Sequence, residues 1–143
     1  KLNMRTIDNF SGQYAFLSNF YPCEVEFEGD AYPSSEHAYQ AAKTIDPDVR
    51  RMIRDLNSPG KAKRTGKDIR IRPDWKNWRT YYMHQILVAK FNIPELREKL
   101  LSTGNSTLIE GNTWNDTYWG VCDGRGENHL GRILMEIRSL LEQ

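Results

Sequence analysis

The chain has 143 residues, of which 38% are hydrophobic and 27% charged, and its net charge is +1. This length and composition predict a single ordinary globular domain over residues 1–143 and argue against a second domain. No apolar run approaches the roughly 20 residues that cross a bilayer, and no basic start precedes an apolar signal segment. We therefore expect a cytoplasmic protein that does not bind membranes.

The two cysteines, Cys23 and Cys122, lie far apart and form no Cys-x-x-Cys motif. This usage indicates a reducing, intracellular compartment. We expect both side chains to act as small buried hydrophobes rather than as reactive thiols. Met4 is a candidate natural start, with Lys1 to Asn3 as an added remnant.

The first third of the chain predicts a loop, a hairpin and a helix. Residues 8–21 mix aromatic residues with Gly, Ser and Asn and show neither helical nor strand periodicity. This pattern is typical of a loop that folds over another part of the structure. Val25 and Phe27 alternate with glutamates before a Gly29-Asp30 turn, which predicts a short hairpin with one face in solvent. A helix then begins, with Ser34 or Ser35 as its N-cap.

The remaining elements are mostly helical. Apolar spacing and Pro or Asn starts predict five helices: from Asp46-Pro47 to Leu56, Ser58-Pro59 to Gly66, Pro73 to Phe91, Pro94 to Gly104, and Asn128 to Leu141. Short strands are expected at Thr107 to Glu110 and at Tyr118 to Val121. The sum is an α+β fold, a mostly helical single domain around a small β-sheet.

Two of these helices have wide expected buried stripes. In the helix after Pro73 the stripe comprises Trp75, Trp78, Tyr81, Tyr82, Ile86, Leu87, Val88, Ala89 and Phe91. In the last helix it comprises Leu130, Ile133, Leu134, Ile137, Leu140 and Leu141. Asn128 is the expected N-cap of this last helix.

The helix that starts at Ser34 or Ser35 gathers chemically active groups on one side. At about 100° per residue, Gln40 lies about 40° from Glu36 and Lys43 about 20° the other way. The opposite side carries Ala38, Ala41 and Ala42. Glu36 and Lys43 are roughly 10 Å apart along the axis, which suits a small ligand held between them. A solvated polar face would show the same pattern.

Positive charge is concentrated in residues 50–79, which contain eleven Lys or Arg and three acids. The segment therefore carries +8, and the remainder of the chain carries −7. Such a basic segment suggests a phosphate-bearing partner, either a nucleotide or a nucleic-acid backbone. The alternative is a pair of solvated helices.

A second unusual segment runs from Glu110 to Gly131 and compresses Trp114, Trp119, Asp116 and several glycines between a strand and a helix. Its glycines permit close approach to a ligand, although a plain glycine-rich turn with core tryptophans fits equally. Its spacing is not that of a dinucleotide fingerprint. Earlier in the chain, residues 18–21 offer an amide and aromatic rings for a base, or simply contribute to the core.

Several other kinds of site are not indicated. The histidines, His37, His84 and His129, show no zinc spacing with each other or with the cysteines. There is no Walker loop and no Gly-x-Ser-x-Gly elbow. We therefore expect neither a metal nor a cofactor.

Four ordered motifs resemble the NADAR superfamily, named for its association with NAD and ADP-ribose, and its YbiA-like members. They are Phe16-Leu17-Ser18-Asn19-Phe20-Tyr21-Pro22, Tyr32 to Lys43, Trp114-x-Asp116-x-x-Trp119-Gly120, and Gly126-x-Asn128-x-Leu130-Gly131-x-x-Leu134-Met135-x-x-Arg138. The resemblance runs from about Phe10 to the C-terminus. One departure is Val121-Cys122-Asp123, where the family has more glycine, and it puts the shape of that loop in doubt.

The resemblance implies an N-glycosidase that cleaves the bond between ribose C1 and a base-like nitrogen. The substrate that it favours is ADP-ribose attached to guanine in DNA or RNA. The alternative is a phosphorylated ribosylamino-pyrimidine intermediate of riboflavin biosynthesis. A further alternative is a module that binds ADP-ribose or NAD without catalysis. A purely structural role would leave both unusual segments unexplained.

The resemblance also implies roles for individual residues. Lys43 would attack C1 and form a Schiff base with the opened ribose, which requires a neutral amine. Glu36 would move protons or hold the ribose hydroxyls, and Asp116 would be the second acid. Trp114 or Trp119 would line the sugar, and Asn19 and Phe20 would contact the base. Gln40, Gly120 and Asn128 are further expected substrate contacts. Arg51, Lys63 or Arg64 are expected at phosphate on the basis of their charge alone. In the alternative mechanism water attacks directly, Glu36 is the base and Lys43 acts only through its charge.

Overall fold

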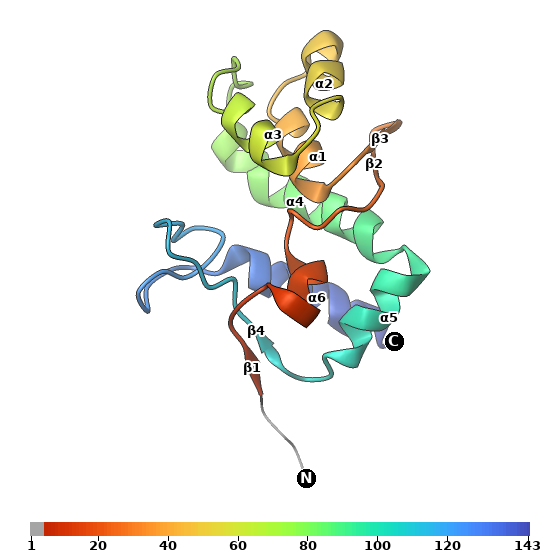
Figure 1. Cartoon of the computed structure of the whole chain (residues 1–143), viewed down its shortest axis with the longest axis vertical. Helices are drawn as coiled ribbons and strands as arrows, with labels where there is room; N and C mark the ends of the chain where they lie inside the picture. Colours follow the sequence, from red (N-terminus) through yellow and green to blue (C-terminus); the bar gives the residue numbers. More distant parts are fainter. Residues whose placement is uncertain (1–4) are drawn as a thin grey trace. The chain divides into compact units, whose positions relative to one another are not determined.

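The computed structural model describes residues 5–143, so the predictions about Lys1 to Asn3 and Met4 lie outside the described residues. About half of the described chain is helical, with four short strands (Figure 1). The predicted mostly helical α+β class is confirmed. The strands form two separate two-stranded pairings.

The chain divides into two compact units. One comprises the described residues 5–18 together with 91–143, and the other comprises residues 19–90. That residues 1–143 form a single domain stays a prediction.

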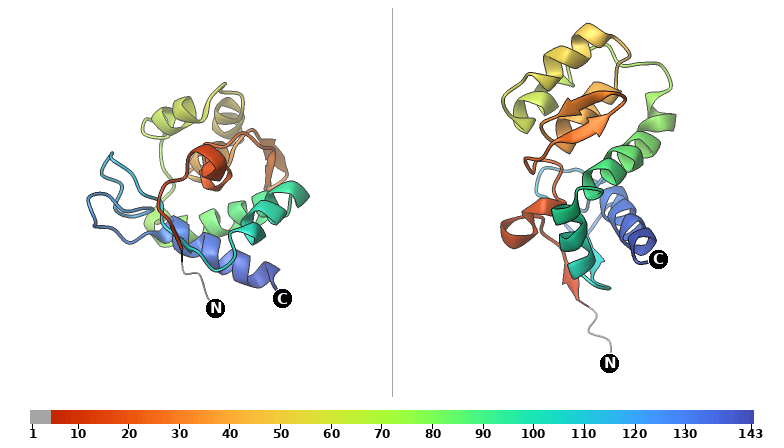
Figure 2. Two further views of the ribbon diagram at one scale, coloured as in Figure 1. Left: turned by 60° about the horizontal axis from the view of Figure 1, so that its bottom comes forward. Right: turned by 90° about the vertical axis from the view of Figure 1, so that its right-hand side faces the viewer.

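In the unit of residues 19–90, the predicted hairpin is present. Strands β2 (Val25–Phe27) and β3 (Asp30–Tyr32) pair antiparallel, with Val25 opposite Tyr32. Val25, Phe27 and Tyr32 are buried while Glu26 is exposed, so one face is in solvent as expected. The hairpin leads directly into α1 (Ser35–Ala42), as the right-hand view of Figure 2 shows.

Helix α1 is the centre of this unit. All eight of its residues are buried, so the alternative of a solvated polar face is wrong. Helices α2 (Pro47–Arg54) and α3 (Pro59–Thr65) pack against it. They begin as predicted, because the side chains of Asp46 and Ser58 accept hydrogen bonds from the first-turn amides.

Helix α4 (Trp75–Phe91) buries a different stripe from the one expected. Trp75, Ile86, Leu87 and Phe91 are buried, but so are Met83 and Lys90. Three members of the predicted stripe are exposed instead, namely Trp78 at 45%, Tyr81 at 49% and Val88 at 38%. The prediction failed because large side chains occur all around this helix, so the apolar pattern alone does not identify its inner face.

In the other unit, β1 (Thr6–Ile7) pairs in parallel with β4 (Thr107–Leu108). The sequence predicted β4 as a longer strand to Glu110 and did not predict β1. Residues Gly12–Leu17 form a 3₁₀ helix, η1, inside the segment expected to be a loop. Its last two residues, Phe16 and Leu17, are buried.

Helices α5 (Pro94–Ser102) and α6 (His129–Leu141) complete this unit and pack together. Leu130, Ile133, Leu134 and Ile137 are buried as expected, but Leu140 is exposed and Leu141 half-buried. They lie in the last turn of α6. The buried Arg138 guanidinium donates 2.8 Å hydrogen bonds to Thr103 Oγ1 and to the carbonyl of Ser106.

Three local predictions need correction or detail. Tyr118 to Val121 form no strand, and only an isolated bridge joins Val121 to Gly111. Cys122 is buried as expected, while Cys23 is half-buried, and burial raises the pKa of the Cys23 thiol.

Within residues 5–143, no helix is both long and apolar enough to traverse a bilayer.

Candidate active site

The start of α1 is fixed by hydrogen bonds to its first turn. Ser34 Oγ accepts from the His37 amide at 3.1 Å, which makes Ser34 the N-cap. The Asn19 carbonyl accepts from the Glu36 amide at 3.0 Å. Asn19 Oδ1 also accepts from Ser35 Oγ at 2.9 Å. Asn19, expected to contact a base, is therefore bonded to the helix that carries Glu36.

His37 ties the same helix to the end of α2. Its Nε2 lies 2.9 Å from the Leu56 carbonyl, and its Nδ1 lies 2.7 Å from Ser34 Oγ. Burial lowers the pKa of His37, with the hydrogen bond to Leu56 opposing the shift. The neutral imidazole suits both contacts, because Nε2–H donates to the carbonyl while Nδ1 accepts from the hydroxyl.

Glu36 and Gln40 form a buried pair one helical turn apart. Gln40 Nε2 donates to Glu36 Oε2 at 2.6 Å. The two residues are only 7% and 3% exposed. A buried carboxylate needs such a donor, because an ion that loses water must be compensated by hydrogen bonds. The structure thus places an oriented acid on α1.

Lys43 is the C-cap of α1 and is half-buried. Its Nζ lies 5.5 Å from the centroid of the Tyr39 ring. Burial lowers the pKa of the Lys43 amine, and although Glu36 acts to raise it, Lys67, Arg79 and Lys63 act in the same direction as burial. A lowered pKa increases the neutral fraction of the amine, which is its nucleophilic form.

The cations near Lys43 differ in part from those predicted to bind phosphate. Lys63 was predicted and acts on Lys43, whereas Lys67 and Arg79 were not singled out. Arg51 forms an ion pair with Asp48 on α2. Arg64 is exposed on α3. Sequence reasoning found the basic segment but could not tell which of its members approach the amine, because that depends on how α3 and α4 pack.

Phe20 is the other residue of this unit that was expected to contact a base. Its ring is 42% exposed, in the segment before the β2–β3 hairpin. The neighbouring Asn19 side chain directs its amide nitrogen to Met83 Sδ at 3.6 Å. Of these two residues, Phe20 therefore presents more of its side chain at the surface.

The other unit holds the loop between β4 and α6, in which polar side chains bond to the loop's own backbone. Asp116 Oδ1 accepts from the amides of Tyr118 and Trp119, at 3.2 and 2.9 Å. Asn112 Oδ1 accepts from the amides of Trp114 and Asp116, at 3.2 and 3.1 Å. These bonds hold the loop in its folded conformation. The loop is the pale-blue to mid-blue segment at the left of the left-hand view in Figure 2.

Four further predicted site residues lie in or beside this loop. Trp114 is 58% exposed, whereas Trp119 is half-buried against Tyr118, with ring centroids 4.8 Å apart. Gly120 is buried, and a side chain there would overlap Glu110. Asn128 bonds to the Glu110 amide and the Leu108 carbonyl, both at 2.9 Å.

The position of Asn128 corrects an expectation about the last helix. Asn128 occupies the N-cap position of α6, but its φ of 54° is left-handed and its side chain makes no capping hydrogen bond. It instead connects the start of α6 to the segment around β4 through the two bonds to Leu108 and Glu110. Asparagine tolerates this backbone conformation better than most residues do.

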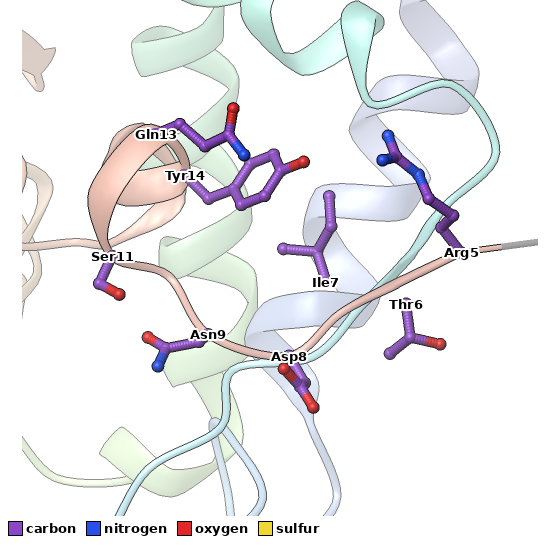
Figure 3. Close-up of a pocket in the computed structure, with 8 residues that line it drawn as sticks. All are labelled: Arg5, Thr6, Ile7, Asp8, Asn9, Ser11, Gln13 and Tyr14. Atoms are coloured by element: carbon purple, nitrogen blue, oxygen red, sulfur yellow. The ribbon is translucent and has the colours of Figure 1, made fainter.

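The same unit contains a depression of about 500 Å³ lined by Arg5, Thr6, Ile7, Asp8, Asn9, Ser11, Gln13 and Tyr14. Figure 3 shows Gln13 and Tyr14 on one side and Arg5 and Ile7 on the other. None of these eight lining residues was predicted to be catalytic. In the described part of the chain there is also no group of three or more His, Cys, Asp or Glu side chains arranged to hold a metal ion.

Comparison with known proteins identifies similar chains. The NADAR domain model matches residues 8–142. An N-glycosidase, YbiA of Escherichia coli K12, is 42% identical over 144 residues, covering 95% of this chain and 89% of that protein. A riboflavin biosynthesis protein of Vibrio vulnificus is 38% identical over 135 residues, covering 91% of this chain and 36% of that protein. The NMR structure of E. coli YbiA matches with a TM-score of 0.86 and 38% identity, covering 99% of this chain and 88% of that one.

Proposed function

Since this chain belongs to the NADAR domain family, we propose that it hydrolyses a ribose C1–N bond in a phosphate-bearing substrate, with Lys43 and Glu36 as its catalytic residues. The observation that carries the proposal is the amine of Lys43. It sits at the end of a buried helix that also presents an oriented carboxylate, and burial and nearby cations lower its pKa.

The enzyme class has independent support. The prediction of a hydrolase acting on N-glycosyl bonds is confirmed by relatives that are named N-glycosidases. The substrate and the chemical steps are proposals. They rest on the residues of α1 and their surroundings.

In the proposed reaction the neutral Lys43 amine attacks C1 as the C1–N bond breaks, and the departing nitrogen takes up a proton. The ribose ring then opens, its ring oxygen gains a proton, and C1 becomes an imine carbon on Lys43. Water adds to this carbon and releases the sugar aldehyde with the free amine. The lowered pKa of Lys43 supports the first step, because a protonated amine has no lone pair to donate.

Glu36 is proposed to carry the protons or to hold the ribose hydroxyls. It lies on the same helix as Lys43, and its charge acts on the Lys43 amine. The 2.6 Å bond from Gln40 fixes one carboxylate oxygen. A fixed carboxylate beside a nucleophile is the arrangement that general acid–base catalysis requires.

We place a phosphorylated ribosylamino-pyrimidine first among the substrates. Two relatives, from Vibrio vulnificus and Zea mays, carry riboflavin biosynthesis in their names, and this chain matches 36% and 23% of their lengths. The cations that act on Lys43, namely Lys63, Lys67 and Arg79, would bind the 5′-phosphate of such a ribose. A single phosphate needs no more than this local cluster.

ADP-ribose attached to guanine in nucleic acid is the second candidate, favoured by the exposed cations. Arg51, Lys61, Arg64 and Arg70 are all exposed in the basic segment. A polyanionic backbone would interact with such a surface, which one small phosphate would not need.

Incubation with each substrate tests the proposal. We expect release of ribose 5-phosphate from the ribosylamino-pyrimidine, loss of this activity in Lys43→Ala and Glu36→Gln, and a borohydride-trapped ribose adduct on Lys43 detected by mass spectrometry. Release of unmodified guanine-bearing DNA alone would select the second candidate. Absence of an adduct during turnover would favour direct attack by water.

Binding measurements address the non-catalytic alternative. If both variants lose hydrolysis yet retain ADP-ribose binding, a module that only binds is excluded. If the unmodified protein binds ADP-ribose but cleaves neither substrate, the proposed reaction is wrong. The role of Asp116 as a second acid stays a prediction.

A further inference from the structure

Gln40 has an unusual hydrogen-bonding state. Its Nε2 donates to Glu36 Oε2 at 2.6 Å, but its Oε1 is buried and has no hydrogen-bond partner among residues 5–143. Buried amide oxygens normally have a donor. Turning the amide over would not help, because Oε1 would then face the carboxylate oxygen, and two acceptors repel. The contact with Glu36 therefore sets the orientation of the amide.

Gly66, the C-cap of α3, lies directly against this amide. A Cβ built on Gly66 would overlap Gln40 Oε1 and lie 2.6 Å from Cδ and 3.3 Å from Cγ. The backbone of Gly66 is right-handed helical, with φ −59° and ψ −20°, so alanine could adopt it without strain. Glycine is therefore required here for space and not for its conformational freedom.

We propose that Gln40 is a positioning residue for Glu36, and that Gly66 provides the space in which the Gln40 amide is held. This reassigns Gln40, which the sequence suggested as a substrate contact. The inference depends on the proposed function, because positioning Glu36 affects turnover only if Glu36 takes part in the reaction. Through Gly66, helix α3 thereby helps to set the geometry of the Glu36 carboxylate, although Gly66 itself does not contact the substrate.

The arrangement has a clear mechanical consequence. Any side chain at position 66 must push the Gln40 amide, and the amide is bonded to the carboxylate. Displacement of a catalytic group by about 1 Å costs on the order of 10²-fold in rate. We therefore expect Gly66→Ala to lower kcat about 10- to 100-fold with little change in KM.

A double-mutant cycle provides the test. Gln40→Ala removes the amide, so it should lower kcat similarly, and Gly66→Ala should then add less than about a twofold effect because nothing remains to be displaced. Gly60→Ala is the matched control on the same helix. A Cβ at Gly60 meets only Arg64 and Ser58, at ordinary distances of 3.7 and 3.9 Å, so its activity should stay unchanged.

A conservative variant separates positioning from folding. Gln40→Met keeps the length of the side chain but removes the donor to Glu36, so the ionised carboxylate loses a stabilising bond. Below the rise of kcat that Lys43 sets, the further fall caused by protonation of Glu36 should then begin at higher pH, while the melting temperature stays close to that of the unmodified protein. A merely structural role would not move this profile.

The outcomes are distinguishable. Independent, multiplicative effects of Gly66→Ala and Gln40→Ala, or an unchanged pH profile in Gln40→Met, would overturn the positioning role. Full activity in Glu36→Gln would instead overturn the proposed function. If Gly66→Ala does not fold, Gln40→Ala and Gln40→Met alone decide the inference, since full activity with an unmoved profile in both contradicts it.

Discussion

In helix α1 the side chains of Glu36 and Gln40 bond to each other, whereas in the loop from Glu110 to Asn128 the carboxylate of Asp116 bonds to the loop's own backbone. Gln40 donates to Glu36, and Glu36 acts on Lys43. Asp116 accepts from two backbone amides of its own loop, and Asn128 bonds to the backbone beside β4. The first pattern orients groups for chemistry and the second fixes a chain conformation.

Hydrogen-bond partners help to separate a catalytic acid from a structural one when both occur in sequence motifs. Glu36 and Asp116 were both predicted to be catalytic, and both lie in motifs dense in polar residues. Their hydrogen bonds differ, because Glu36 bonds to a side chain and Asp116 Oδ1 bonds to amides of its own loop. Substitutions should therefore reduce activity in α1 and stability in the loop.

The largest expected effect is that of Lys43→Ala, which should lower kcat by about 10³-fold or more, because it removes the nucleophile. Lys43→Arg is the informative comparison variant, since it keeps the positive charge but cannot form a Schiff base. Steady-state kinetics on the ribosylamino-pyrimidine would measure both. Activity in Lys43→Arg near that of the unmodified protein would assign Lys43 an electrostatic role only. Lys99→Ala, an exposed lysine of α5, is the control.

The second prediction concerns Asp116. Asp116→Ala should destabilise the fold by about 1–2 kcal/mol in urea denaturation, because two loop amides lose their acceptor. Asp116→Asn retains an equivalent oxygen and should stay close to the unmodified protein in stability. A loss of activity in Asp116→Asn at unchanged stability would instead establish the catalytic role that the sequence suggested.

Local features of the fold were predictable because their signals are local. Ser34, Asp46 and Ser58 are small polar residues before helical periods, and each is found to cap its helix. The pairing of Thr6 with Thr107 was not predicted. Strands of two residues show no alternation to recognise, and their partner lies about a hundred residues away.

The same distinction applies to the candidate site. The grouping of Glu36, Gln40 and Lys43 follows from helical spacing, so the sequence predicted it. The burial of the whole of α1 and the contribution of Lys67 and Arg79 to the Lys43 pKa depend on packing by other helices. The contact of Gly66 with Gln40 is of this kind too, and only the structure reveals it.

The third prediction tests whether the N-terminal half of α1 depends on a neutral His37. Its pKa is lowered in the folded protein, so the unfolded chain binds a proton first as pH falls below about 6.5. The stability that His37 contributes above this pH is therefore lost as pH falls toward its folded-state pKa. The slope is at most about 1.4 kcal/mol per pH unit. Urea denaturation from pH 7.5 to 5 should show a shallower slope in His37→Gln, and identical slopes would contradict the prediction.

The smallest expected effect tests the electrostatics around the amine. Lys67→Met removes a charge that lowers the pKa of Lys43, so that pKa should rise. Because the neutral amine is the reactive form, kcat increases with pH, and the midpoint of this increase should move to higher pH, by the small amount expected when one screened charge is removed. Lys61→Met, which removes an exposed charge from α3, should leave the midpoint in place. Added salt should shrink the Lys67 shift by screening it. An equal shift in both variants would mean that the charge of the whole segment, rather than the neighbours of Lys43, tunes the nucleophile.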